Sequence, residues 1–156
     1  MAQMEDQSDV IAFLSDPSAH GGAAVERIDT HMSHLFLTPH TVYKLMRAVR
    51  YPMIVDFADV AKRVAACRAE LEANAAMAGD LYRRVRRITR DGEALAWDGA
   101  GETVDSVVEM ARFDEATRFD RLAENGALER WMIDQIAGLA GQAHMAAPER
   151  PPLGPC

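Results

Sequence analysis

Lys44 and Glu70 are the residues whose types and spacing could do chemistry, because Lys44 lies on a predicted strand and Glu70 near the middle of a predicted long helix. Phosphoryl transfer uses such a pair: a strand lysine contacts the phosphates, a helix carboxylate holds that lysine, and backbone groups after another strand bind the adenine. Glu109 and Met110 end an apolar run and suit the last role. Strand lysines and helix glutamates are common in α+β domains. From spacing alone we therefore favour the interpretation that Lys44 and Glu70 are solvated and form an exposed pair that contributes little energy.

The long helix that carries Glu70 is predicted over 59–77 and is the clearest element of the sequence. Its larger apolar residues recur at steps of four, three and four along one stripe, at Val60, Val64, Cys67 and Leu71. Glu70 follows Cys67 by three residues, so its carboxylate lies at the edge of the buried stripe. From there it can reach inward to a cation on a strand.

Five short strands are predicted around this helix, at 25–37, 42–45, 81–89, 94–97 and 104–110. A first helix, capped by Ser8, is expected to end before Pro17. The apolar stripe of a closing helix comprises Leu128, Trp131, Met132, Ile136, Leu139 and Ala143. The predicted fold class is α+β, with a mainly antiparallel five-stranded sheet, one long helix, and flanking N- and C-terminal helices.

The length of 156 residues suits one domain, which we expect over 9–146, after a flexible N-terminus at 1–8 and before a Pro-rich disordered tail at 147–156. The net charge of −7 makes nucleic acid an unlikely partner. Two cysteines, Cys67 and Cys156, build no disulfide framework. With no apparent signal peptide or membrane span, these features predict a soluble cytoplasmic protein.

An ordered set of short motifs along nearly the whole chain resembles a known family. The set comprises Asp29-Thr-His-Met-Ser33, Phe36-Leu37, Tyr43-Lys44, Asp56-Phe57, Glu70-Leu71 with Asn74, Leu81-Tyr82, Val108-Glu-Met110, Arg112-Phe113, Asp120-Arg-Leu122 and Ala143-His144. In this order the chain is similar to the N-terminal region of bacterial aminoglycoside-phosphotransferase-like proteins, a protein-kinase-like family often fused to a P-loop ATP-binding domain.

The resemblance implies a protein-kinase-like small lobe followed by the first helices of a larger lobe. It implies that Lys44 contacts phosphate, that Glu70 is its helical partner, and that Glu109 and Met110 are hinge positions beside adenine. ATP is the implied cofactor, and Mg²⁺ enters only through ATP. The implied partners are a second copy of the chain or a separate larger-lobe or ATPase protein.

The sequence also departs from the family pattern. Met46 and Ala48 stand where the family has a second lysine and a proline, and Ala111 stands where it has an arginine. More importantly, no histidine is followed two residues later by an aspartate, so the catalytic loop is missing. No base, magnesium ligand or acceptor site can therefore be named.

The expectation is a truncated or degenerate kinase that retains at most an ATP-binding half-site and is not catalytic alone. The first alternative is a non-catalytic interaction or self-associating module, because Trp131 and Met132 would face an absent lobe and leave an apolar patch. The second alternative is one half of a split small-molecule kinase.

Two further groups of residues receive structural interpretations. Asp29, His31 and His34 could suggest a metal site, but the two histidines would point to opposite faces of a strand, so His31 is expected to be a hydrogen-bonded structural histidine. A basic run spans Arg83–Arg90 in an acidic chain. We expect a solvated strand face paired with acidic residues, with phosphate or RNA contact as the alternative.

Overall fold

The computed structural model describes residues 4–75 and 77–147 of the chain. The chain divides into two compact units, Met1–Phe113 and Asp114–Cys156. The described residues form an α+β fold with a six-stranded antiparallel sheet and four α-helices. Among them, no helix is long and apolar enough to span a membrane.

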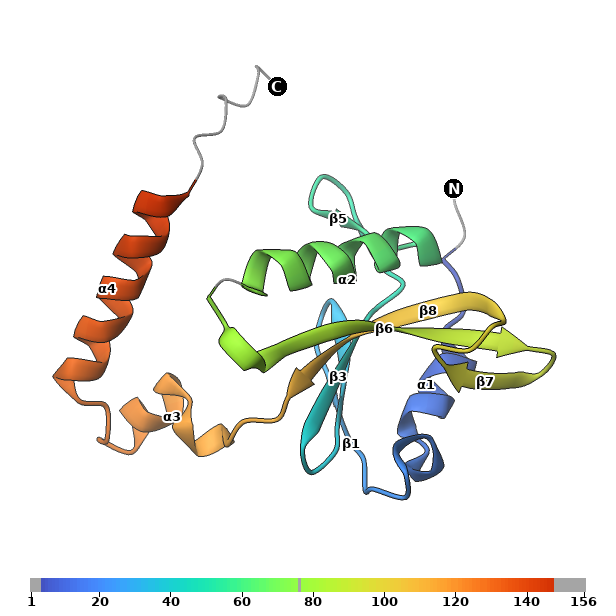
Figure 1. The fold of residues 1–156 in the computed structure, drawn as a ribbon, viewed down its shortest axis with the longest axis horizontal. Coiled ribbons are helices and arrows are strands. Elements are labelled where there is room, and N and C mark those ends of the chain that lie inside the picture. The colour runs from blue at the N-terminus through green and yellow to red at the C-terminus, as the bar shows by residue number, and fades with distance from the viewer. Residues whose placement is uncertain (1–3, 76, 148–156) are drawn as a thin grey trace, which may run out of the picture. The chain divides into compact units, whose positions relative to one another are not determined.

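The first unit contains the sheet, whose strand order is β1-β2-β3-β8-β6-β7 (Figure 1). The strands are β1 (Glu26–Asp29), β2 (Ser33–Leu37), β3 (Thr41–Met46), β6 (Tyr82–Asp91), β7 (Ala94–Trp97) and β8 (Glu102–Ala111). A separate two-stranded hairpin comprises β4 (Arg50–Tyr51) and β5 (Val55–Asp56). Every neighbouring pair of strands is antiparallel.

The sheet has six strands instead of the predicted five because the segment expected as one strand over 25–37 folds back on itself. The Thr30 hydroxyl accepts a 3.0 Å hydrogen bond from the Ser33 backbone N–H, and the Thr30 N–H donates to the Ser33 carbonyl at 2.9 Å. These bonds close a tight turn between β1 and β2, since a threonine hydroxyl can replace a backbone partner in a turn.

Helices cover both faces of the sheet, as Figure 1 shows. α1 (Ser8–Ser15) and the 3₁₀ turn η1 (Pro17–His20) lie on one face, and α2 (Val60–Ala75) lies on the other. The core on the α1 side comprises Val10, Leu14, Phe36, Leu45, Ile88 and Val107. The core on the α2 side contains Met46, Cys67 and Val108. Consecutive residues of β3 and of β8 thus contribute to opposite cores, because successive side chains of a strand point to opposite faces of the sheet.

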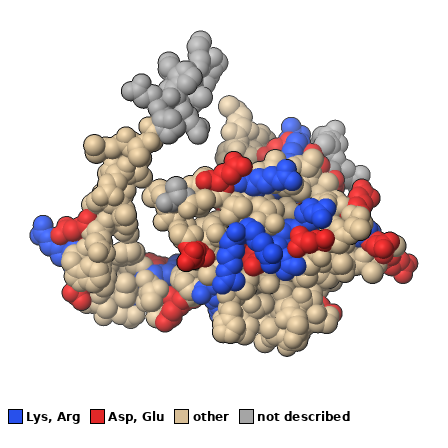
Figure 2. Space-filling view, viewed as in Figure 1, with Lys and Arg blue, Asp and Glu red and all other residues tan. Residues whose placement is uncertain are grey.

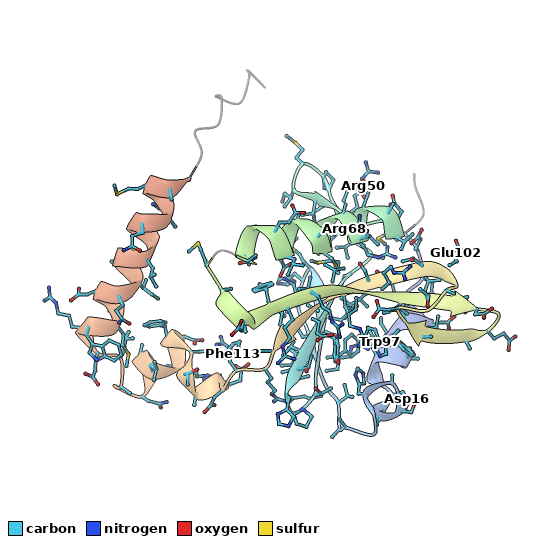
Figure 3. The ribbon with its side chains drawn as sticks, in the orientation of Figure 1. Asp16, Arg50, Arg68, Trp97, Glu102 and Phe113 are labelled. Atoms are coloured by element: carbon cyan, nitrogen blue, oxygen red, sulfur yellow. The ribbon has the colours of Figure 1, made fainter. Side chains whose placement is uncertain are left out.

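The aromatic residue Trp97 joins η1 to the sheet (labelled in Figure 3). Its indole N–H donates a 2.8 Å hydrogen bond to the Ala19 carbonyl, and its ring centroid lies 5.1 Å from that of Tyr43. The Arg86 guanidinium lies 4.2 Å from the Trp97 ring centroid on β7. The Ala19 carbonyl thus supplies the hydrogen-bond acceptor that an indole N–H normally needs when it is withdrawn from water.

The N-terminal segment before α1 takes part in the fold, although we expected residues 1–8 to be flexible. The Gln7 side chain is buried; its amide donates to the Met46 carbonyl at 2.9 Å and its oxygen accepts the Ala48 N–H at 2.7 Å. Ser8 was expected to cap α1, but the Asp6 carboxylate accepts the Ser8 N–H instead, at 2.9 Å. Residues 1–3 lie outside the described residues.

The second unit consists of the 3₁₀ turn η3 (Glu115–Thr117), α3 (Phe119–Glu124) and α4 (Arg130–Ala146). The expected closing helix is thereby confirmed. No residue of α4 is buried, and its large apolar side chains Trp131, Ile133, Ile136, Leu139 and Met145 are exposed. Residues 148–156, where we expected a disordered tail, lie outside the described residues.

Candidate functional site

The Lys44 ammonium and the Glu70 carboxylate form a bidentate ion pair. Lys44 Nζ lies 2.8 Å from Glu70 Oε1 and 2.9 Å from Glu70 Oε2. The Lys44 side chain is 26% exposed and that of Glu70 is 17% exposed, so the pair is partly withdrawn from water. The expectation of a fully solvated pair is therefore wrong. Screening by water makes exposed ion pairs weak, and here that screening is reduced.

The sheet and α2 together position this pair. Lys44 lies opposite Leu35 of β2 and Val108 of β8, so it sits on an interior strand. One turn of helix before Glu70, the Cys67 side chain is buried and its thiol lies 3.7 Å from the Ser106 carbonyl. Because Glu70 follows Cys67 by three residues, it lies on the same side of the helix, and packing of Cys67 turns the Glu70 carboxylate toward the strand.

Burial also controls the chemistry of Cys67. Desolvation raises the pKa of its thiol to about 11, with the hydrogen bond to Ser106 opposing that shift. The thiol therefore stays protonated at neutral pH and is a packing residue, since thiolate is the reactive form.

Tyr82 is a third member of the site that the sequence did not assign. Its hydroxyl donates a 3.2 Å hydrogen bond to Glu70 Oε1, and burial together with the Glu70 charge raises the pKa of that phenol. The motif Leu81-Tyr82 was visible in the sequence, but nothing in it indicated a partner on the helix. Glu70 therefore accepts hydrogen bonds from both a lysine and a tyrosine.

The predicted hinge residues Glu109 and Met110 lie within the sheet and pair with strands on both sides. Glu109 is opposite Tyr43 of β3 and Arg84 of β6, and Met110 is opposite residues of the same two strands. The pairing with β6 ends at Met110, whereas that with β3 continues through Ala111. The Arg112 N–H then donates to the His40 carbonyl at 3.1 Å. After Met110, Ala111 therefore pairs with Thr41 of β3 and not with β6, and Arg112 bonds to the loop that precedes β3.

Glu109 also has an electrostatic role that the sequence did not indicate. Its carboxylate lies 3.2 Å from Arg84 and 3.8 Å from Arg86. Other members of the basic run pair with acids too: Arg86 lies 2.8 Å from Asp98, and Arg90 lies 2.9 Å from Asp9. The expectation of acidic partners for the basic run is therefore confirmed at these positions.

Near the β1–β2 turn, the Asp29 carboxylate is hydrogen-bonded to Arg27 and to His34. Asp29 Oδ1 lies 2.7 Å from Arg27 Nε and 2.8 Å from His34 Nδ1, and these hydrogen bonds, that of Arg27 first, lower the pKa of Asp29 to about 2. His34 is buried and His31 is exposed, so the structural histidine is His34 and the prediction for His31 is wrong. Across residues 4–75 and 77–147, no three His, Cys, Asp or Glu side chains converge as metal ligands.

Comparison of the chain with protein-family models, with curated proteins and with solved structures finds no match.

Proposed function

We propose that this chain is a truncated or degenerate kinase of the aminoglycoside-phosphotransferase-like group, which retains the ATP-binding half-site of a kinase small lobe. The observation that carries the proposal is the bidentate contact between Lys44 and Glu70. In protein kinases a lysine of the third strand contacts the phosphates of ATP and is held by a glutamate of the following helix. Here Lys44 lies on β3 and Glu70 on α2, the next α-helix along the chain.

The geometry of the pair suits phosphate binding. A lysine held by a carboxylate on one side is oriented before the ligand arrives, which reduces the entropy lost on binding. The Lys44 side chain is 26% exposed, and in this proposal an anion approaches its ammonium from the exposed side. In this proposal Lys44 is the phosphate-contacting residue and Glu70 is a positioning residue.

The adenine contact is assigned to the chain after Met110. The backbone groups of Glu109 and Met110 face paired strands on both sides, whereas Ala111 has a strand partner on the β3 side only. A base that uses backbone hydrogen bonds needs groups that no neighbouring strand occupies. We therefore move the proposed hinge from Glu109 and Met110 to the segment that begins at Ala111, in which the Arg112 N–H is already donated to the His40 carbonyl.

The proposed half-site is not expected to transfer phosphate alone. Catalysis of phosphoryl transfer depends on positioning and on charge stabilisation by a base and by metal ligands. The sequence has no histidine followed two residues later by an aspartate. Mg²⁺ would enter with ATP and be held through its phosphates.

Calorimetric titration of the purified chain with Mg-ATP tests the proposal. We expect saturable binding that is lost in Lys44→Ala and weakened in Glu70→Gln. Lys62→Ala is the matched control, because Lys62 is the other lysine of the chain and lies on α2, 2.9 Å from Asp56 and 3.0 Å from Asp59. Absence of binding to the folded wild-type chain, or equal loss in both lysine variants, would contradict the nucleotide half-site.

The second candidate function is an interaction module, and the exposed apolar side chains of α4 favour it. Trp131 is 53% exposed and Leu139 is 61% exposed. Apolar patches of this kind are commonly covered by a partner or by a second copy. Light scattering across a range of protein concentrations, with Leu139→Lys as the variant, would detect self-association through this helix.

A further inference from the structure

Most Lys and Arg side chains of the described residues are neutralised by carboxylates, and Arg68 and Arg87 are exceptions. Within residues 4–75 and 77–147, the Lys and Arg residues that form no ion pair are Arg47, Arg68 and Arg87. The guanidinium of Arg47 donates a hydrogen bond to the Thr30 carbonyl at 2.6 Å, and that of Arg87 reaches the Gly99 carbonyl at 3.4 Å. Arg68 and Arg87 are both exposed.

These two arginines line the same surface groove, which we call the α2–β6 groove. Its lining residues are Val60, Ala61, Val64, Arg68, Arg87 and Thr103, and its volume is about 360 Å³. Arg68 comes from α2, where Figure 3 labels it, and Arg87 comes from β6. Figure 2 shows Lys and Arg side chains over α2 and over the strands beside it on this face. The groove thus combines an apolar floor with two cations that lack a carboxylate partner.

We propose that the α2–β6 groove docks an acidic peptide segment of a partner protein. Its carboxylates would accept hydrogen bonds from Arg68 and Arg87, and an aliphatic side chain would pack on Val60, Ala61 and Val64. Charge complementarity favours an acidic segment, because guanidinium groups bind carboxylates well and no acidic residue lines the groove. The aliphatic floor favours a peptide that carries an apolar anchor between its acids.

The charge of the chain argues against nucleic acid as the occupant. The net charge is −7, which repels a long polyanion, whereas a short acidic segment meets only the local field of the two arginines. The aliphatic floor also offers no aromatic ring for stacking a base. This inference is independent of the proposed nucleotide site, because Lys44 and Glu70 do not line the groove.

Fluorescence anisotropy with a labelled peptide tests the docking proposal. The probe is a hexapeptide of sequence Glu-Asp-Leu-Leu-Asp-Glu, blocked at both ends and carrying a fluorophore. One comparison peptide has the amides Gln and Asn in place of the acids, and another has Ser in place of Leu. We expect saturable binding of the probe and at least about tenfold weaker binding of each comparison peptide, since a charge-assisted contact or a buried leucine contributes that much.

Paired variants locate the binding. The double variant R68Q/R87Q is expected to bind the probe at least about tenfold more weakly. The double variant R47Q/R130Q has the same net charge and alters residues outside the groove, so it should bind like wild type. Mapping of NMR amide chemical shifts on the wild-type chain gives an independent readout. We expect the amide signals of Val64 and Thr103 to shift when the probe binds.

Three outcomes would overturn the proposal. The first is the absence of saturable binding of the acidic probe up to about 1 mM. The second is equal weakening in both double variants, which would indicate attraction by overall charge. The third is displacement of the probe by a short polyuridine oligonucleotide at lower concentration than by unlabelled peptide, which would assign the surface to nucleic acid.

Discussion

Tyr82 and Glu70 are joined by a 3.2 Å hydrogen bond, in which the phenol donates to the carboxylate oxygen that also lies 2.8 Å from the Lys44 ammonium. Tyr82 is the first residue of β6 and lies opposite Met110 of β8. The bond therefore connects α2 to the sheet at the point where pairing between β6 and β8 ends. The orientation of Glu70 depends on both neighbours.

Replacement Tyr82→Phe should lower the free energy of unfolding by about 1 kcal/mol, because it removes a hydrogen bond to a partly buried carboxylate while keeping the ring. Urea unfolding followed by circular dichroism measures this change. Tyr51→Phe is the matched control, since Tyr51 is 40% exposed and should change stability by less than about 0.5 kcal/mol. Equal effects of the two substitutions would show that the bond to Glu70 contributes nothing measurable.

The contact between Lys44 and Glu70 was predictable because local rules determine it. Cys67 of the predicted stripe is buried, and Glu70 follows it by three residues. The other buried residue of the helix is Arg63, whereas the stripe residues Val60, Val64 and Leu71 are only half-buried. The contact of Tyr82 with Glu70 was not predictable, because it depends on the register of β6. An irregularity between Tyr82 and Arg84 shifts that register, and no residue type in the segment signals it.

Arg63 and Asp105 form a buried ion pair that the sequence also concealed. Arg63 is 1% exposed and Asp105 is 0% exposed, and Arg63 Nη2 lies 2.9 Å from Asp105 Oδ2. Gln7 donates to the same Asp105 oxygen at 2.8 Å, and Glu5 lies 2.9 Å from Arg63. Burial raises the pKa of Asp105, against the lowering effect of Arg63. An arginine in a helical pattern normally indicates an exposed face, so only the tertiary contacts reveal this role.

Replacement Arg63→Met should lower the free energy of unfolding by about 3–5 kcal/mol, because it leaves the Asp105 carboxylate buried without its cation. The double variant R63M/D105L should recover much of that loss, because an apolar pair needs no desolvation of charge. Lys62→Met is the control for a partly exposed pair and should cost less than about 1 kcal/mol. Urea unfolding measures all three, and a double variant no more stable than Arg63→Met would contradict this account.

Cys67 should resist thiol reagents in the native protein. Its side chain is buried and its pKa is raised to about 11, so the reactive thiolate is scarce below that pH. In the variant Cys156→Ser, Ellman's reagent at pH 8 is expected to titrate no thiol until urea unfolds the chain, and then one thiol per molecule. Rapid reaction of the folded variant would show that the α2 side of the core opens readily.

Replacement Gly101→Ala should destabilise the chain by several kcal/mol, on the order of a severe core substitution. A Cβ atom at Gly101 would lie 2.0 Å from the backbone carbonyl oxygen of Arg90, so the backbone would have to move. Gly138→Ala is the control, because a Cβ atom there meets nothing within 4 Å and alanine favours the helix. Thermal unfolding compares the two, and equal melting temperatures would contradict the close approach at Gly101.

The sequence predicted most elements closely: the strands expected at 42–45, 81–89, 94–97 and 104–110 are confirmed as β3, β6, β7 and β8, whereas the short helix α3 was not predicted. The helix expected over 59–77 is confirmed as Val60–Ala75, because its stripe repeats for several turns. The prediction of one strand over 25–37 was wrong, because the segment forms β1 and β2 joined by a turn. The hydrogen bonds of Thr30 and Ser33 close that turn, and they do not change the alternation of polar and apolar residues. The proposed hinge position depends on where β6 stops pairing with β8, and no residue type in the sequence signals that point.

β8 is the last strand within the described residues and yet lies between β3 and β6 in the interior of the sheet. During synthesis, the strands β1–β2–β3 and β6–β7 therefore remain two separate pieces until residues 102–111 have left the ribosome. Until then the edges of β3 and β6 that β8 covers are unpaired. Folding of this sheet is thus a late, long-range event that joins both pieces at once, and such topologies fold slowly. A nascent chain that stops before residue 102 would expose the edges of β3 and β6 that β8 covers in the folded sheet, in addition to the outer edges of β1 and β7.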